Sequence, residues 1–295
     1  LILKENGMTM DREGFDREMA AQKARARNAA AVEATDWVTV NPGEPEFVGY
    51  DNAEATTRIL RYRLVKQKKG QFYQIVLARS PFYAEMGGQV ADHGVIAADG
   101  ALFEVTDVQK DKAGKFLHHG VLRSGRLQVE QTVTARIDTD RRKAIMRAHS
   151  ATHLLQAALR EVLGDHVHQA GSLVEPDRLR FDLTHFSAVT PDELQRINEI
   201  VSDWILDGMD VTVSEMTMEQ AKAAGATALF SEKYGDVVRV VNMGGKSVEL
   251  CGGTHVDNTA KVGPFRITGE SSVASGVRRI EAITGKAYLH EMEAV

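Results

Sequence analysis

Two short motifs constrain this chain most, because each pairs two side chains that can bind a metal: His149 with His153, and Cys251 with His255. The first motif lies in a strongly helical run, residues 141–163, so its two imidazoles lie on one helix face, one turn apart. The second follows a strand-like run and contains two glycines, which predicts a tight turn that returns its ends to one point. Three imidazoles and a thiolate suit zinc better than magnesium or calcium.

Each motif alone also has an ordinary interpretation. A histidine pair one turn apart is often just part of a helix face, and a lone cysteine is often a small buried apolar residue. The chain has one cysteine and ten histidines, and the presence of both motifs together favours the metal. The sequence therefore predicts about one zinc ion per chain, held by the four residues.

Composition indicates a globular protein without a membrane-spanning segment. The 295 residues are enough for two domains, and 43% hydrophobic with 26% charged residues is ordinary for a globular protein. No run of 18 apolar residues is present, so we expect no membrane partner. One cysteine cannot form an internal disulfide, which favours the cytoplasm. A net charge of −5 argues against nucleic-acid binding over the whole surface, and we expect no DNA partner, but a local basic patch stays open.

Three segments follow from the patterning. Residues 1–34 contain a helical candidate and precede a break rich in proline and glycine. Residues 35–138 contain short alternating runs, such as 58–65 and 71–78, separated by turn signals, which predicts a small β-barrel. Residues 139–295 mix helices and antiparallel-type strands without regular βαβ repetition, so the expected fold class is α+β.

Helix starts are marked in the third segment. Thr190 is followed by proline and, three residues on, by glutamate, and Thr217 is followed three residues on by glutamine. Both patterns predict a capping box at the start of a helix.

One stretch, residues 80–94, lacks the alternating pattern of the predicted strands and is expected to be a loop. Two consecutive glycines in it allow the backbone to approach a ligand closely, and Gln89 can both donate and accept hydrogen bonds. A β-bulge or a tight turn with a surface amide explains the same residues equally well. The sequence leaves the two interpretations open.

Basic residues flank both metal motifs. Arg141 and Arg142 begin the helix that carries the first motif, and Arg278 and Arg279 follow the second. Basic clusters beside a metal site suit a polyanionic substrate, so we expect phosphate contacts among these four. The alternative is a solvated charged face.

Four stretches in register carry a family resemblance: FYAEMGGQVADHG, RAHSATHLL, CGGTHV and GVRRIEAITG. In order and spacing, over nearly the whole chain, they resemble the editing region of the alanyl-tRNA synthetases. Met86 departs from the family, which more often has a small residue before the two glycines, and we expect this to change the packing of the loop and not the chemistry. The chain begins with Leu1, so we expect a fragment of a longer protein.

The resemblance implies a substrate and a reaction. The substrate is tRNA(Ala) mischarged with serine or glycine, and the reaction is hydrolysis of the ester. Zinc can polarise the carbonyl or acidify a water, and we expect Gln89 and Cys251 as catalytic residues, with the glycine loop projecting Gln89 over the metal to orient water or the substrate amine. The general reason for such a site is that a pocket for a small apolar side chain cannot strongly reject a smaller molecule or one with an extra hydroxyl. The sequence gives no account of how glycine is accepted while alanine is spared.

The same motifs also fit two other functions. A stand-alone trans-editing deacylase resembles the chain in both metal motifs, and a non-catalytic tRNA-binding module with a structural zinc would carry the same ligands. A metalloprotease is disfavoured because the helix lacks the glutamate expected beside the first histidine. No stretch resembles the aminoacylation core, so we expect the chain to hydrolyse and not to charge tRNA.

Overall fold

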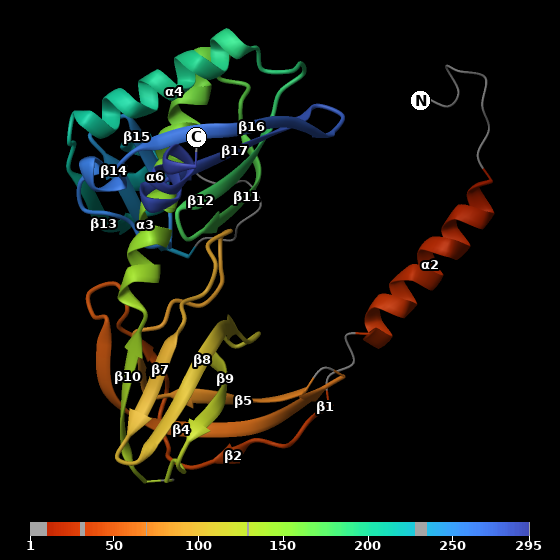
Figure 1. Ribbon diagram of the computed structural model, residues 1–295, viewed down its shortest axis with the longest axis vertical. Helices are drawn as coiled ribbons and strands as arrows, with labels where there is room; N and C mark the ends of the chain where they lie inside the picture. The colour runs from red at the N-terminus through yellow and green to blue at the C-terminus, as the bar shows by residue number, and fades with distance from the viewer. Residues whose placement is uncertain (1–10, 30–32, 69, 129, 228–234, 295) are drawn as a thin grey trace.

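The fold is α+β, as expected, and is built on antiparallel sheets (Figure 1). The computed structural model describes residues 11–29, 33–68, 70–128, 130–227 and 235–294. Helix α2 (Arg12–Ala29) confirms the helical candidate near the start of the chain. The rest of that expected segment, residues 1–10 and 30–32, lies outside the described residues.

The first sheet has eight strands: β1 (Glu33–Ala34), β2 (Val38–Thr39), β4 (Glu54–Gln67), β5 (Gly70–Leu77), β7 (Gly94–Ala98), β8 (Ala101–Lys110), β9 (Phe116–Ser124) and β10 (Thr132–Ile137). The order is β1-β4-β10-β7-β8-β9-β5, with β2 also on β4, and β4 pairs with β5 as well as with β10. The long β4 can do this because its first residues face β10 and its later residues face β5. The expected strands at 58–65 and 71–78 are confirmed within β4 and β5.

A separate hydrophobic core fills this first unit. Alternate side chains of its strands point inward, as the period of two in a strand requires, and the fully buried ones include Leu77, Ile96 and Phe103. The loop between β6 (Arg79–Ser80) and β7 also contributes Phe82 to this core. Strand β6 pairs in parallel with β3 (Glu46–Phe47).

The second unit is organised around helix α3 (Thr139–Leu163), which confirms the helix expected at 141–163. Asp138 caps α3 by accepting a hydrogen bond from the backbone N–H of Arg141. Apolar residues such as Leu154, Leu155 and Leu159 on α3 are fully buried in the largest described core cluster. In Figure 1, α3 rises from the end of the first sheet and passes through the second unit.

Two antiparallel sheets surround α3. The four-stranded sheet contains β11 (Gln169–Glu175), β12 (Arg178–Thr184), β17 (Val277–Thr284) and β16 (Phe265–Ala274), in that order. The three-stranded sheet contains β13 (Val211–Thr217), β14 (Val237–Met243) and β15 (Ser247–Leu250).

Three further helices, α4 (Pro191–Leu206), α5 (Met218–Ala223) and α6 (Gly285–Glu293), complete the second unit with the short 3-10 turn Thr259–Val262. The capping boxes expected at Thr190 and Thr217 are both present, at the starts of α4 and α5. Within the described residues, the structure has no helix that combines the length and the apolar character needed to cross a bilayer.

A buried ion pair joins the two units. Arg142 near the start of α3 is only 7% exposed, and its Nε donates to Asp92 at 2.9 Å. Its other nitrogens donate to the backbone carbonyls of Gly49 and Pro81 at 2.7 and 3.1 Å. These partners engage the guanidinium of Arg142 inside the protein, which argues against the expected phosphate contact.

A buried histidine in the first unit predicts how stability depends on pH. His118 is fully buried, its Nδ1 donates to the carbonyl of Ile75 at 2.9 Å, and its Nε2 lies 2.6 Å from Ser80 Oγ. Burial lowers the pKa of His118 to about 4. Between this pKa and the ordinary value of about 6.5 the unfolded chain binds the extra proton, so the free energy of unfolding should fall by about 3 kcal/mol as the pH drops through that window.

The measurement is urea unfolding of the parent and of His118→Gln between pH 4 and pH 7. The variant should be less stable at pH 7 and should lose less stability on acidification. Two curves that run parallel over the whole window would show that His118 does not supply this pH dependence.

Candidate metal centre

The structure brings together all four residues of the two motifs. His149 and His153 lie one turn apart on α3, with their ring centroids 5.2 Å apart. Cys251 follows directly after β15, and His255 lies at the end of the turn that begins there. The ligand atoms of the four residues all lie within 4.8 Å of one another.

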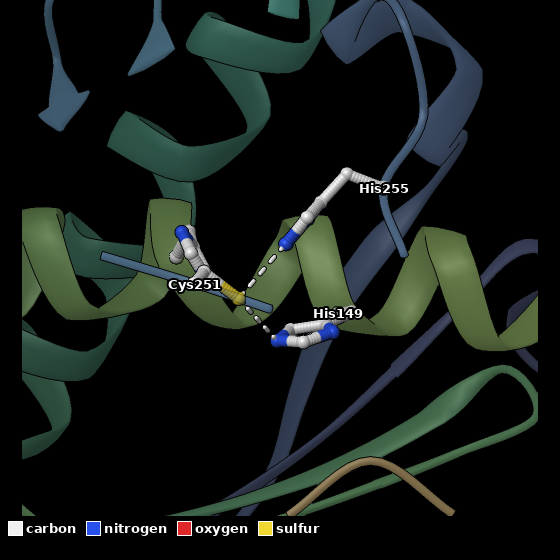
Figure 2. Close-up of side chains that lie close together, drawn as sticks. His149, Cys251 and His255 are labelled. Atoms are coloured by element: carbon white, nitrogen blue, oxygen red, sulfur yellow. Dashed lines mark hydrogen bonds between the residues drawn. The ribbon is translucent and has the colours of Figure 1, made fainter. Parts of the chain in front are cut away.

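The distances between these atoms fit a zinc ion. Cys251 Sγ lies 3.5 Å from His149 Nε2 and 3.3 Å from His255 Nε2 (Figure 2). A tetrahedral zinc ion with bonds of about 2.3 Å to sulfur and 2.0 Å to nitrogen separates those two donors by about 3.5 Å. The cluster therefore already has the spacing that a single ion requires, and both donor types suit zinc.

Hydrogen bonds behind the rings set the tautomers. His149 Nδ1 lies 2.7 Å from Gln89 Oε1, an oxygen that can only accept, so Nδ1 carries the proton and Nε2 presents a lone pair to the cluster. His255 Nδ1 lies 3.1 Å from Ser150 Oγ, which also accepts from the backbone N–H of Val256. Such outer contacts orient metal-binding histidines.

His153 is the least satisfied of the three histidines. Its Nδ1 is buried without a hydrogen-bond partner in the described part of the chain, and it lies 3.7 Å from the Glu249 carboxylate, too far for a hydrogen bond. Burial lowers the pKa of His153, but the charges of Glu249 and Cys251 and a hydrogen bond with Cys251 together outweigh burial and raise this pKa to about 9. A metal that binds here must displace a proton from this imidazole.

The surroundings of Cys251 favour its thiolate form, which can bind a cation. Burial would raise the pKa of the Cys251 thiol, but the charges of His149, His255 and His153 outweigh it and hold that pKa well below its ordinary value. The thiolate is the form that binds metals and acts as a nucleophile.

A cleft of about 690 Å³ opens beside the cluster. His149, His153 and Cys251 line it, whereas His255 faces a separate cleft of about 460 Å³. The first cleft is also lined by polar side chains that the sequence did not predict as site residues: Tyr83, Lys110, Thr152, Gln156, Gln169, Ser172, Thr227, Arg239 and Glu249. The helical spacing of Thr152 and Gln156 relative to the histidines could have indicated them.

Gln89 lies elsewhere than expected. It is fully buried and does not line the cleft, because Gly88 and Val90 on either side of it hydrogen-bond to the backbone of Val174 in β11. Its amide instead supports the second motif, since Oε1 accepts from the backbone N–H of Thr254 and Nε2 donates to Thr254 Oγ1, each at 2.9 Å. The structure thus places Gln89 behind His149 and not over the metal position.

Comparison with known proteins shows which family has this sequence. A family described as tRNA synthetases class II (A) matches residues 1–141, and one described as the threonyl and alanyl tRNA synthetase second additional domain matches residues 238–281. The chain is 50% identical to the alanine–tRNA ligase of Porphyromonas gingivalis over 300 residues, which cover 100% of this chain and 34% of the relative. It belongs to the alanyl-tRNA synthetase family.

Other family members give the same picture. The chain is 52% identical to the alanine–tRNA ligase of Bacteroides fragilis, over 99% of this chain and 33% of the relative. It is 48% identical to that of Pelotomaculum thermopropionicum, over 98% of this chain and 34% of the relative. The chain thus spans about a third of the length of these synthetases.

The other arginines expected to contact phosphate in this family member are also engaged. Arg141 is half-buried and donates to the carbonyl of Ala91 at 2.6 Å. Arg278 pairs with Glu270 through two hydrogen bonds of 2.6 and 2.7 Å, and Arg279 pairs with Asp182 at 2.7 and 2.9 Å. A phosphate would compete with these carboxylates for Arg278 and Arg279, whereas the guanidinium of Arg141 has only a carbonyl partner among the residues that the structure describes.

Tyr50 and Arg239 hold the turn that carries Cys251. Tyr50 Oη donates to the carbonyl of Gly252 at 2.6 Å, across 202 positions of sequence. Arg239 Nη1 donates to the carbonyls of Cys251 and Gly253 at 2.8 and 2.9 Å, and its guanidinium lies 4.3 Å above the Tyr50 ring. Neither residue lies in a metal motif, so neither could be predicted from the motifs.

A methyl group at Gly253 would overlap the His149 ring and lie 2.9 Å from Gln89 Oε1. We therefore expect Gly253→Ala to displace His149 and to reduce zinc bound per chain, measured by elemental analysis after reconstitution. Gly252→Ala is the matched control, since the nearest atom to its added methyl would be the flexible end of Met86 at 3.3 Å. Equal zinc content in both variants would contradict the packing argument.

Removal of one hydroxyl tests the support of the turn. Tyr50→Phe should release zinc to a chelator about 10-fold faster than the parent, because the Gly252 carbonyl loses its hydrogen bond and the Cys251 turn gains freedom. Tyr288→Phe, on α6, serves as the control and should match the parent. A chelation rate of Tyr50→Phe equal to that of Tyr288→Phe would remove Tyr50 from the support of the site.

Proposed function

We propose that this chain carries the editing site of an alanine–tRNA ligase, a zinc-assisted aminoacyl-tRNA deacylase. Its substrate is tRNA(Ala) mischarged with serine or glycine. The observation that carries the proposal is that three of the four converging ligands line a cleft of about 690 Å³. The part of the chain that matches the family described as tRNA synthetases class II (A) ends at residue 141. All four ligands lie after residue 141, outside that match, which supports a separate site.

The residues of the chain divide the chemical work. His149, His153, Cys251 and His255 hold the zinc, which when bound supplies a Lewis acid that polarises the ester carbonyl or acidifies a water. Gln89 and Ser150 keep two of the imidazoles in the orientation that binds metal. Cys251 contributes as a thiolate, and its half-buried side chain faces the cleft into which the aminoacyl end enters. Gln89 acts on catalysis through His149 and the turn, as a positioning residue.

The domain limits form part of the same proposal: a linker at 1–34, a barrel at 35–138 and the editing domain at 139–295. Separate core clusters in the two units support the second boundary. The return of strand pairing to β4 through β5 supports the barrel. A cytoplasmic site of action fits the single cysteine, half-buried beside three histidines.

We assign tRNA contact first to positive charge near the cleft and at the base of α3. Lys110 and Arg239 line the cleft, and Arg141 lies half-buried at the start of the helix. Arg278 and Arg279 contribute if phosphate displaces Glu270 and Asp182 from their ion pairs. Such contacts make the affinity for tRNA fall as salt rises.

A second candidate is a tRNA-binding module whose zinc is structural. Four protein ligands close a tetrahedral zinc site, and the three histidines are each at most 9% exposed. This candidate predicts tight tRNA binding and no hydrolysis.

The deciding experiment measures deacylation of Ser-tRNA(Ala), Gly-tRNA(Ala) and Ala-tRNA(Ala) by the protein before chelation, after chelation and after zinc is restored. The proposal expects hydrolysis of the first two, sparing of the third, loss on chelation and recovery with zinc. Cys251→Ala should lower Ser-tRNA(Ala) hydrolysis at least 10²-fold and also weaken zinc retention. Tight binding of tRNA without turnover in every preparation would establish the structural-zinc candidate.

A further inference from the structure

Gln156 is a buried amide without a partner in the cleft. It is only 4% exposed, lines the cleft, and its side chain has no hydrogen-bond partner among the described residues. It lies on α3 at the position i+7 from His149 and i+3 from His153, so it continues the helix face that carries both ligands. One helical turn therefore separates the amide from the metal centre.

The amide of Gln156 faces the cleft. Among the described residues, the polar atoms that are both shielded from solvent and without a hydrogen-bond partner do not include those of Gln156, so a molecule in the cleft can reach its amide. The neighbouring polar side chains of the cleft are already engaged: Thr152 Oγ1 donates to the Ala148 carbonyl, and Gln169 Nε2 donates to Ser172 Oγ. The free capacity of Gln156 is therefore available to a ligand.

We infer that Gln156 hydrogen-bonds the serine hydroxyl of the mischarged tRNA and selects serine against alanine. This rests on the proposed function, since it names the group that recognises the substrate. The hydroxyl can accept from the amide nitrogen and donate to the amide oxygen. The methyl group of alanine can do neither and leaves the amide unpaired, which discriminates between two side chains of nearly equal size.

The role also fits the position of the cluster. The ester carbonyl has to lie beside the cluster for its hydrolysis, and the serine side chain branches from the carbon next to that carbonyl. A specificity group therefore has to lie within a few ångströms of the metal ligands, and Gln156 lies one turn from His153 on the same helix. Glycine has no hydroxyl, so its hydrolysis should depend much less on Gln156.

The test is Gln156→Met, which keeps the length of the side chain and removes the amide. The kcat/KM for Ser-tRNA(Ala) should fall about 10- to 100-fold, while that for Gly-tRNA(Ala) changes less than about threefold. Zinc per chain should match the parent. The Tm should stay close to the parent value, because the amide has no hydrogen bond within the described residues that the substitution could remove.

Gln74→Met is the matched control. Gln74 is also buried, at 8% exposed, but its amide accepts from Arg63 Nε at 2.6 Å and lies 2.8 Å from His119 Nε2 in the first unit. This variant should lower the Tm and leave hydrolysis of both substrates unchanged. The two variants should thus differ in their effects on stability and on activity.

Three outcomes overturn the inference. An equal fall for the serine and glycine substrates would show that Gln156 contacts a group common to both, such as the α-amino group. Unchanged hydrolysis of Ser-tRNA(Ala), with an active parent, would leave the proposed function standing and remove Gln156 from it. An inactive parent would instead defeat the proposed function, and the assignment of Gln156 with it.

Discussion

The structure depends on one buried guanidinium, that of Arg142 at the start of α3. It pairs with Asp92 and donates to the carbonyls of Gly49 and Pro81. Those three residues belong to the two loops of the first unit that carry Tyr50 and Gln89, the side chains that support the metal centre from outside the second unit. Removal of one partner from such a pair costs about 3–5 kcal/mol, because it leaves a buried charge unpaired. The ion pair therefore fixes α3, which carries two ligands, relative to the loops that orient them.

The metal centre and the cleft contain polar groups that the chain itself leaves without full hydrogen bonding. The ligand atoms of three imidazoles and a thiolate lie within 4.8 Å of one another, His153 Nδ1 has no hydrogen-bond partner in the described residues, and Glu249 lies half-buried beside it. Gln156 adds an unpaired amide on the same helix face. A fold selected for stability alone would satisfy these groups or replace them with apolar ones. A bound cation and a polar substrate satisfy them from outside the chain.

Local physics made much of the fold predictable. The capping boxes at Thr190 and Thr217 and the helix at 141–163 depend on residues a few positions apart, and all three are confirmed. The expected strands depend on alternation within single runs. Strand β7 is not predictable in this way, because it directly follows the glycine loop, where the pattern is too short to separate strand from loop. The misplaced residues, Gln89 and Arg142, are those whose surroundings come from the other unit.

The sequence by itself determined the ligand set, the class of metal and the family, because the spacing within each motif fixes a helix face or a turn and residue type fixes donor chemistry. Only the tertiary structure decided what each polar side chain does with its hydrogen bonds. Gln89 hydrogen-bonds to His149 Nδ1, and Arg142 pairs with the buried carboxylate of Asp92. Gln156 lines the cleft, where its amide can contact a ligand. The physical reason is that a hydrogen bond or an ion pair needs its partner within a few ångströms. These partners lie 50 to 60 positions away in the sequence, or in the substrate.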